Sequence, residues 1–315
     1  MGGVQTYSSQ KNFFFFLSSF GFLSDSRGMD NTTALRLATL ASLNRLAELE
    51  STLVQMFPPA VYKKGSWGFH AQKMIAFLRD GVPAFTIFTR GNSKLPFVSF
   101  SVLPLVSCPG AGACKEYCYS LKAWRYPAAF FRQLQNLILL SSKEGLEYII
   151  QAWNKIEKEA QVRLYVDGDI HNLDTLAFWF GLCYSRPDLS VYGYSKSWGV
   201  FLRWQGEFPA NYTLNLSSGS VYNAEVKAQI AKLPIVRGEF VAVQASVDAP
   251  KRDKKTGEVD LAAWQAYRKA VTESANKAGH SKVFVCPGLC GFCSNGKHAC
   301  GNRAFDGVTI AIGIH

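Results

Sequence analysis

Short apolar runs alternate with amphipathic stretches from about Leu95 to the end of the chain. The runs at 97–106, 162–169, 189–196, 212–218, 240–246 and 282–286 have the length and composition of β-strands. Helical periodicity covers 127–160, with a break expected near Ser141, and also 172–184, 223–233 and 261–278. Strands separated by helices favour parallel pairing through right-handed crossovers. We therefore predict an α/β fold, a barrel-like and mostly parallel β/α sheet with two cysteine-rich loops.

The residues before Leu95 follow a different pattern. The run KNFFFFLSSFGFL, Lys11–Leu23, resembles the apolar core of a signal peptide, but it is too short to span a bilayer as a helix and lacks a cleavage site. Met29 follows, and the residues behind it have capping side chains and helical periodicity. We expect 1–28 to be a leader or over-extended start, 29–94 an amino-terminal helical and basic region, and 95–315 the β/α core with the cysteine clusters.

The charge of the chain is positive and unevenly distributed. Lysine and arginine outnumber aspartate and glutamate 34 to 23, a formal charge of +11. Ten basic and two acidic residues lie between Ala60 and Gln135, so this quarter of the chain carries an excess of +8. Such a segment favours a polyanion such as DNA, although a solvated surface that binds nothing is an equal alternative. The predicted nucleic-acid contacts are Lys63, Lys64, Lys94, Lys115, Lys122, Arg125 and Arg132.

Seven of the eight cysteines fall into two clusters. The first cysteine loop, SCPGAGACKEYCYSLKAWRYP at 107–127, has the spacing Cys-x5-Cys-x3-Cys, and the second, CPGLCGFCSNGKHAC at 286–300, has Cys-x3-Cys-x2-Cys-x6-Cys. Such short spacings suit a shared metal better than disulfides, which favours a reducing cytoplasm and no membrane partner. The eighth cysteine, Cys183, is expected in the core. The predicted metal ligands are Cys108, Cys114, Cys118, Cys286, Cys290, Cys293 and Cys300.

The two clusters differ in the number of ligands they offer. Three thiolates of the first loop cannot close a tetrahedral zinc site alone, but they can hold three irons of a 4Fe-4S cluster and leave the fourth iron open. Four thiolates of the second loop can close a zinc or iron–sulfur site, which is more often structural than reactive. Buried structural thiols are the alternative for both. The cysteine spacing does not decide between zinc and an iron–sulfur cluster.

Further polar residues stand where predicted strands end. Asp167 and Asp169 flank Gly168 and are candidates for Mg²⁺ binding or for sharing a proton, with a helix cap and turn as the alternative. Tyr194 and Lys196 share one side of the next strand and suit a phosphate or carboxylate contact, or core packing. Tyr119 lies one helical turn before a lysine, a weak pattern for a nucleophilic tyrosine. These five residues are the catalytic candidates.

Several motifs together resemble the gene-product-88 family of phage and plasmid proteins. They are CPGAGACKEYCYSLKAWRYP, VRLYVDGDIHN, LSVYGYSKSW, CPGLCGFC and the closing VTIAIGIH. The resemblance implies a cysteine loop and β/α pattern similar to radical S-adenosylmethionine barrels, with S-adenosylmethionine as a candidate cofactor. It places Cys108, Cys114 and Cys118 in one centre, Cys286, Cys290 and Cys293 in another, and Asp167, Asp169 and Lys196 facing a cavity between them. Relatives on small plasmids are usually taken as replication proteins.

Two departures limit what the resemblance implies. The Cys-x5-Cys-x3-Cys spacing is longer than that of radical S-adenosylmethionine enzymes, although Cys286, Cys290 and Cys293 have the usual spacing. The chain also lacks the His-hydrophobe-His motif of rolling-circle nickases. We therefore expect a DNA-binding replication protein of a plasmid or phage with a cysteine-bound metal or iron–sulfur centre. The alternative is an iron–sulfur enzyme that acts on a small molecule or nucleic acid.

Overall fold

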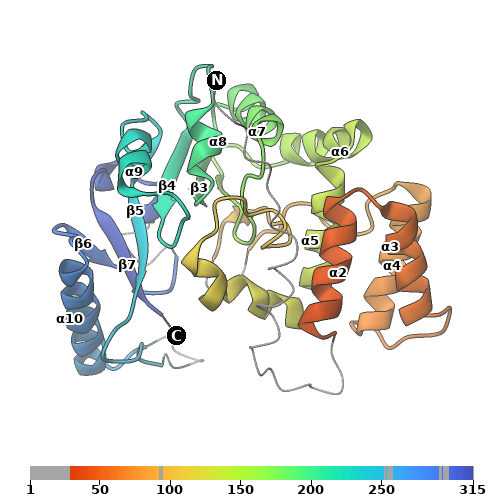
Figure 1. Ribbon diagram of the computed structural model, residues 1–315, viewed down its shortest axis with the longest axis horizontal. Helices are drawn as coiled ribbons and strands as arrows, with labels where there is room; N and C mark the ends of the chain where they lie inside the picture. The colour runs from red at the N-terminus through yellow and green to blue at the C-terminus, as the bar shows by residue number, and fades with distance from the viewer. Residues whose placement is uncertain are drawn as a thin grey trace, which may run out of the picture.

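A seven-stranded parallel sheet forms the centre of the protein in the computed structural model (Figure 1). The structure describes residues 29–91, 95–251, 253, 258–290, 293 and 298–314. The strand order is β1-β2-β3-β4-β5-β7-β6, and every neighbouring pair runs parallel. This confirms the predicted α/β class and parallel sheet. β1 and β6 lie at opposite ends of the order, and no pairing joins them among the described strands, so the sheet is open.

Helices follow most strands along the chain. The strands are β1 (Val98–Ser99), β2 (Gln161–Leu164), β3 (Ser190–Ser195), β4 (Tyr212–Ser217), β5 (Val236–Val243), β6 (Val283–Val285) and β7 (Thr309–Gly313). The α-helices are α2 (Asn31–Ser42), α3 (Leu46–Met56), α4 (Trp67–Asp80), α5 (Pro127–Leu139), α6 (Lys143–Asn154), α7 (Leu173–Ser185), α8 (Trp198–Leu202), α9 (Ala224–Ile230) and α10 (Leu261–Lys277). Four short 3₁₀ helices are η2 (Ala113–Tyr117), η3 (Tyr119–Arg125), η4 (Ala299–Gly301) and η5 (Arg303–Phe305).

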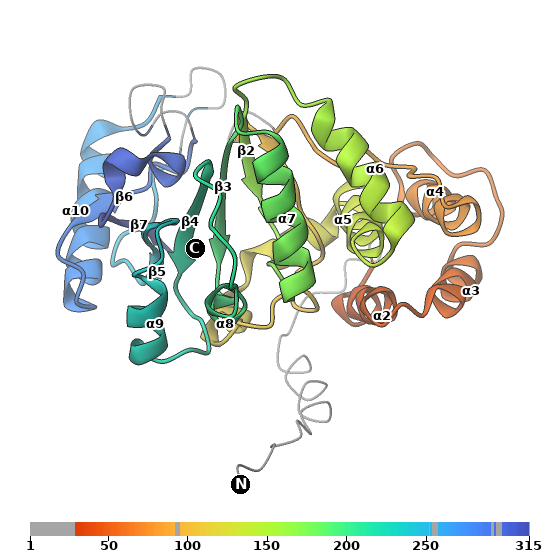
Figure 2. The ribbon, with the colours of Figure 1, turned by 90° about the horizontal axis from the view of Figure 1, so that it is seen from above.

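The amino-terminal helices lie beyond α5 and α6, at the opposite end of the molecule from α10 (Figures 1 and 2). Asp30 caps α2 by accepting a hydrogen bond from the Thr33 amide. α2 and α3 are separate because Asn44 adopts a left-handed conformation (φ 54°). Their apolar faces join the core that also covers the sheet, while the expected boundary at 94/95 stays a prediction. The expected leader at 1–28 lies outside the described residues. No helix in the described ranges is long and apolar enough to cross a membrane.

The observed strands differ from the predicted ones in their bounds, and the structure adds a strand that was not predicted. The expected strand 97–106 was too long, because regular pairing is limited to β1. The chain turns through Pro104 and Leu105, and the φ of Leu105 is 69°. Before this turn, the Phe100 and Val102 amides still donate hydrogen bonds to carbonyls of β2 and of the turn after it. The closing segment forms β7, which inserts between β5 and β6 and so gives the sheet its non-sequential edge. The predicted helix break near Ser141 is confirmed, since α5 ends at Leu139 and α6 begins at Lys143.

Aromatic side chains fill the core between β2 and the helices. Trp179 of α7 is fully buried, and its ring lies 4.7 Å from that of Phe100 and 6.2 Å from that of Trp153 (centroid distances). Its indole N–H donates to the Tyr165 hydroxyl at 2.8 Å. Tyr165 has φ 56° and ends the path of β2. The core therefore fixes the point at which the Asp167 turn leaves the sheet.

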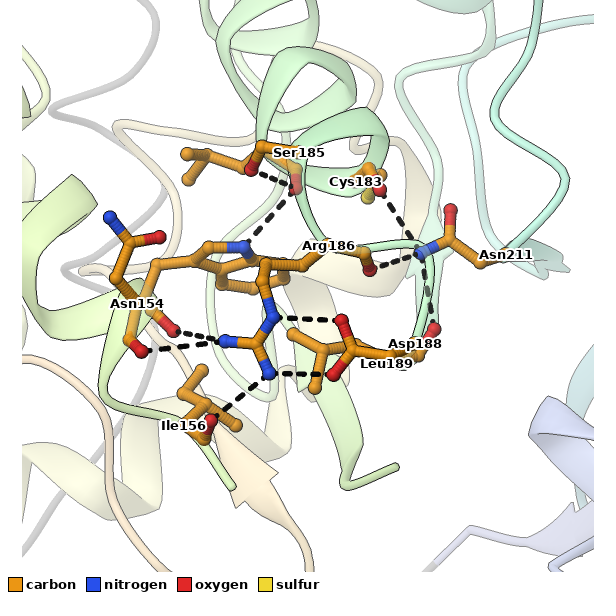
Figure 3. A network of polar contacts seen from close by, with 10 residues as sticks. Asn154, Ile156, Cys183, Ser185, Arg186, Asp188, Leu189 and Asn211 are labelled. Carbon is orange, nitrogen blue, oxygen red and sulfur yellow. Dashed lines mark hydrogen bonds and ion pairs between the residues drawn. The ribbon is translucent and has the colours of Figure 1, made fainter. Parts of the chain in front are cut away.

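A polar network fastens the turn between α7 and β3 (Figure 3). The Arg186 guanidinium donates Nε to Asp188 Oδ1 at 2.8 Å and Nη2 to Asp188 Oδ2 at 2.7 Å. It also donates to the Ile156 carbonyl at 3.1 Å. The Asn211 amide donates to three carbonyls of the same turn. A largely buried arginine is thus satisfied here by carbonyls together with a carboxylate partner.

Candidate metal centre and nucleic-acid interface

The polar residues predicted from the sequence lie at the carboxyl edge of the sheet. All strands run parallel, so the segments that follow them leave at the same edge. The first cysteine loop comes after β1, Asp167 and Asp169 after β2, and Lys196 directly after β3. Cys286 follows β6, and its amide continues the ladder to the Ala311 carbonyl at 2.8 Å. Both cysteine loops therefore begin at this edge.

The first cysteine loop is docked against the ends of β3 and β4. The Gly112 amide donates to the Gly219 carbonyl at 2.9 Å, and the Val221 amide donates to the Gly110 carbonyl at 3.0 Å. A Cβ atom on Gly110 would lie 1.8 Å from the Lys196 carbonyl oxygen, so only glycine fits this close approach. The two 3₁₀ helices of the loop, η2 and η3, meet at Cys118.

The three thiols of the first cysteine loop lie in a shared electrostatic environment. Burial and the Asp169 charge raise the pKa of Cys108 to about 12. Burial raises the pKa values of Cys114 and Cys118, and the nearby Lys196 ammonium opposes both shifts. Cys118 also interacts with the other two thiols. These buried thiols are neutral at pH 7 unless a metal displaces their protons.

The two aspartates are held by different partners. The Asp169 carboxylate is buried and accepts hydrogen bonds from the amides of Ile170 at 2.7 Å, Lys196 at 2.8 Å and Ser197 at 3.2 Å. It therefore fastens the end of β3 to the β2 turn. Asp167 accepts a hydrogen bond from the Gln133 amide at 2.9 Å. Burial raises the pKa of both carboxyl groups, against the hydrogen bonds and cations beside them.

Lys196 and Tyr119 also have specific partners. The Lys196 ammonium donates to the Ser217 hydroxyl at 2.9 Å. Tyr119 is 58% exposed, but its hydroxyl turns inward and donates to the Val166 carbonyl at 2.7 Å. Burial of this hydroxyl raises the pKa of Tyr119, which opposes formation of a nucleophilic phenolate. Tyr119 and Asp167 therefore lie at the same turn after β2, and the Tyr119 hydroxyl is hydrogen-bonded to the backbone of that turn.

The second cysteine loop packs on the opposite side of the same strands. Cys300 is buried with Tyr192, Ala299 and Ile310, and Cys286 and Cys293 pack against this cluster. The Asn215 side chain on β4 donates to the Cys300 carbonyl at 2.8 Å. Burial raises the pKa of Cys286 to about 12 and that of Cys300 to about 11. Tyr194, a catalytic candidate, is instead partly buried and interacts electrostatically with Cys300.

The candidate metal ligands do not form a closed coordination site in this structure. In the described ranges, no group of three or more His, Cys, Asp or Glu side chains is arranged to hold one metal ion. The four cysteines of the second loop nevertheless interact with one another electrostatically, as do the three of the first. Metal binding by either set, and Mg²⁺ binding by the aspartates, stay predictions.

The predicted nucleic-acid contacts divide into separate groups. Lys115, Lys122 and Arg125 are exposed on the first cysteine loop, together with the exposed tyrosines Tyr117, Tyr119 and Tyr126. We call these six residues the first-loop rim. Lys63 and Lys64 are exposed between α3 and α4. Arg132 is half-buried on α5, and its charge acts on Asp167 rather than on a free surface. Lys94 lies outside the described residues.

Sequence reasoning missed two strand arginines, Arg163 on β2, which is partly buried, and Arg237 on β5, which is buried. Arg163 lies over the Tyr194 ring at 4.5 Å from its centroid, and Arg237 is 1% exposed. A signal was present in the sequence, because each arginine stands beside apolar residues in its strand. The alternation of side chains along a strand places the arginine on the face opposite these neighbours. No site was predicted on that face, where Tyr194 and Cys300 lie beside Arg163.

Comparisons with known proteins give one relationship. No curated protein and no solved structure matches this sequence. The model of the family described as gene product 88 matches residues 82–296, which include the first cysteine loop, the aspartate turn, Lys196 and three cysteines of the second loop. The match covers more than half of the chain. The chain therefore belongs to the gene product 88 family.

Proposed function

We propose that this protein binds DNA through the first-loop rim and serves in replication of a plasmid or phage, with the cysteines holding a metal or iron–sulfur centre. The observation that carries the proposal is the grouping of three exposed cations and three exposed tyrosines on one loop. Family relatives on small plasmids are usually taken as replication proteins, which supports the biological role.

The chemistry of the first-loop rim suits single-stranded or distorted DNA. Tyrosine rings stack on bases of any sequence, at about 1–3 kcal/mol per base, and lysine and arginine contact phosphates. The rim is anchored from below, because the Tyr119 hydroxyl and the Gly110 and Gly112 backbone are bonded to the sheet edge. A bound metal beneath the rim would order the loop further, with Cys108, Cys114 and Cys118 as its ligands.

Removal of the rim cations is expected to weaken DNA binding and its salt dependence. The variant carries Lys115→Gln, Lys122→Gln and Arg125→Gln together. Each lost phosphate contact makes the slope of log affinity against log salt less negative by about 0.7 on single strands. We expect the slope to change by about 2 for three contacts. Fluorescence anisotropy with single-stranded plasmid-origin DNA, from low to physiological salt, measures both affinity and slope.

The matched control removes three exposed cations from α6 and the turn that follows it. Lys143→Gln, Lys155→Gln and Lys158→Gln change the net charge by the same amount at a site remote in sequence from the loop. If DNA contact is local to the first-loop rim, this control keeps the wild-type slope. Equal slopes for the two triple variants would show that only net charge matters, and wild-type binding without any salt slope would rule out electrostatic DNA binding.

A second candidate function is an iron–sulfur enzyme. It is favoured by the position of Cys108, Cys114 and Cys118 in one loop after the first strand of a parallel sheet, beside Lys196 and the aspartates. A 4Fe-4S cluster on three cysteines would supply an open iron for a substrate or S-adenosylmethionine. Around it, Lys196 would offer a cation for a carboxylate or phosphate, and the first cysteine loop, docked on the sheet edge, would limit access of water.

Metal analysis separates this candidate from a purely DNA-binding protein. Protein purified without oxygen is expected to contain iron and acid-labile sulfide, and the Cys108→Ser, Cys114→Ser and Cys118→Ser variant is expected to lose the portion bound by the first loop. A colourless protein that holds stoichiometric zinc would eliminate the iron–sulfur enzyme and leave the DNA-binding proposal standing.

A further inference from the structure

Arg237 is a buried cation that has only neutral partners. Its Nε donates to Asn215 Oδ1 at 2.7 Å, and its Nη1 donates to the carbonyls of Phe305 at 2.9 Å and Val308 at 2.8 Å. Its Nη2 donates to the Glu239 carbonyl at 3.2 Å. No carboxylate of the described residues lies within ion-pair distance of this guanidinium. Its hydrogen bonds are satisfied, but its charge has no contacting carboxylate: Asp306 acts on it only from a distance and is itself paired with Arg303.

Arg163 is in a similar position on the same side of the sheet. Its guanidinium lies over the Tyr194 ring, and its Nε has no hydrogen-bond partner among the described residues. It too has no carboxylate within ion-pair distance in the described part of the chain. Burial of an uncompensated cation costs several kcal/mol in a folded protein. A negative charge nearby would stabilise two such cations on one face of the sheet.

Elsewhere this chain pairs a largely buried arginine with a carboxylate. Arg186 also donates to backbone carbonyls, and Asp188 supplies the counter-charge through two hydrogen bonds (Figure 3). Arg163 and Arg237 lack the equivalent of Asp188. Asp167 and Asp306 act on Arg163 and Arg237 from beyond ion-pair distance, and both arginines also interact electrostatically with the Cys300 thiol, Arg163 with that of Cys290 as well.

A second observation points to the same place. The Tyr192 hydroxyl is fully buried and has no hydrogen-bond partner among the described residues. It interacts electrostatically with Cys290, Cys293 and Cys300. Both ring nitrogens of His298, which is 2% exposed and contacts the Tyr192 ring, are also without partners within the described ranges. A metal-bound sulfur beside them would accept hydrogen bonds that this pocket otherwise leaves unmade.

We propose that Cys286, Cys290, Cys293 and Cys300 bind one metal centre as four thiolates and that Arg163 and Arg237 balance its charge. Zn²⁺ or an oxidised 4Fe-4S cluster with four thiolates carries two negative charges, which the two guanidinium groups offset. On zinc binding, four S–H groups release their protons to solvent and four zinc–sulfur bonds form, without any change of oxidation state. The centre fastens the second cysteine loop to β3, β4 and β7.

The inference deepens the metal-binding part of the proposed function and is independent of DNA binding. The test uses the full chain with Cys108→Ser, Cys114→Ser and Cys118→Ser, purified without oxygen, so that metal in the second loop is measured alone. Zinc, iron and sulfide per chain identify the centre, and transfer of the metal to a chromophoric chelator gives its release rate. We expect one zinc or one 4Fe-4S cluster per chain, lost on Cys300→Ser.

The arginine variants test the charge balance. Arg163→Gln is expected to release the metal about ten- to a hundredfold faster, the usual effect of losing a group outside the ligand set, whereas Arg163→Lys keeps the charge and stays close to the parent. Arg186→Gln is the matched control, since this arginine interacts with Asp188 and not with the thiols of the second loop, and the release rate should not change. Arg163 is suited to this test because its Nε has no hydrogen-bond partner among the described residues, so the substitution removes no such contact from the sheet.

Three results would overturn the inference. The first is a folded parent protein without zinc or iron–sulfur centre, and the second is metal content unchanged by Cys300→Ser. The third is equal release rates for Arg163→Gln, Arg163→Lys and Arg186→Gln. DNA binding by the same preparations is measured separately, so loss of the metal and failure of the DNA-binding proposal remain distinguishable.

Discussion

Replacing Trp179 by alanine is expected to lower the free energy of unfolding by about 3–5 kcal/mol, the usual cost of removing a large aromatic from a core. The side chain is fully buried, and its ring contacts those of Phe88, Phe100 and Trp153. Its loss also leaves the Tyr165 hydroxyl without its indole donor. Urea denaturation followed by circular dichroism measures the change.

Two further variants separate packing from hydrogen bonding. Trp179→Phe keeps most of the packing and removes the N–H donor, so we expect a loss of about 1–3 kcal/mol. Tyr184→Ala removes an aromatic from the same helix where it is 48% exposed, and we expect a change within about 0.5 kcal/mol. A Trp179→Ala variant no less stable than Tyr184→Ala would contradict the described core. Since Trp179 holds Tyr165, the larger loss should also loosen the Asp167 turn.

The sequence pattern predicted the alternating order of strands and helices because that order is local. Periodicity and capping residues placed α7, α9 and α10 within a few residues of their bounds and located the break between α5 and α6. The length of β1 was not predictable from apolar composition, since regular pairing stops where the chain turns at Leu105. The insertion of β7 between β5 and β6 is a long-range pairing that no local pattern encodes.

For the candidate site, the sequence predicted which residues lie there but not which groups each of them contacts. Strand-end position correctly indicated that Lys196 and the aspartates lie at one edge, because parallel strands share that edge. The roles of individual groups required tertiary contacts: Asp169 binds three backbone amides, and Tyr194 is partly buried beside Cys300. Arg163 was not identified as a site residue, since a charged residue in a strand usually faces solvent, although its apolar neighbours were a signal.

Gly110→Ala is expected to displace the first cysteine loop from the end of β3. The added Cβ would lie 1.8 Å from the Lys196 carbonyl oxygen and 2.7 Å from the Ser197 Cα, and both are backbone atoms that cannot rotate away. The loop must therefore shift, which breaks the hydrogen bonds that the Gly110 carbonyl accepts from the Val221 amide and Ser220 hydroxyl. We expect the sheet to remain folded, because its core lies elsewhere.

The matched control is Gly181→Ala in α7. A Cβ atom on Gly181 would meet nothing within 4 Å, so alanine should leave the fold intact and add up to about 1 kcal/mol of helix stability. Circular dichroism of both variants at the assay temperature establishes that each is folded before binding is compared.

DNA affinity of these two variants tests most directly that the docked first cysteine loop is the binding surface. At one fixed salt concentration, Gly110→Ala should bind single-stranded origin DNA about tenfold more weakly than the wild type, a loss of about 1.4 kcal/mol, with a shallower salt slope. Gly181→Ala should match the wild type. Wild-type affinity and slope in a folded Gly110→Ala protein would contradict the proposal.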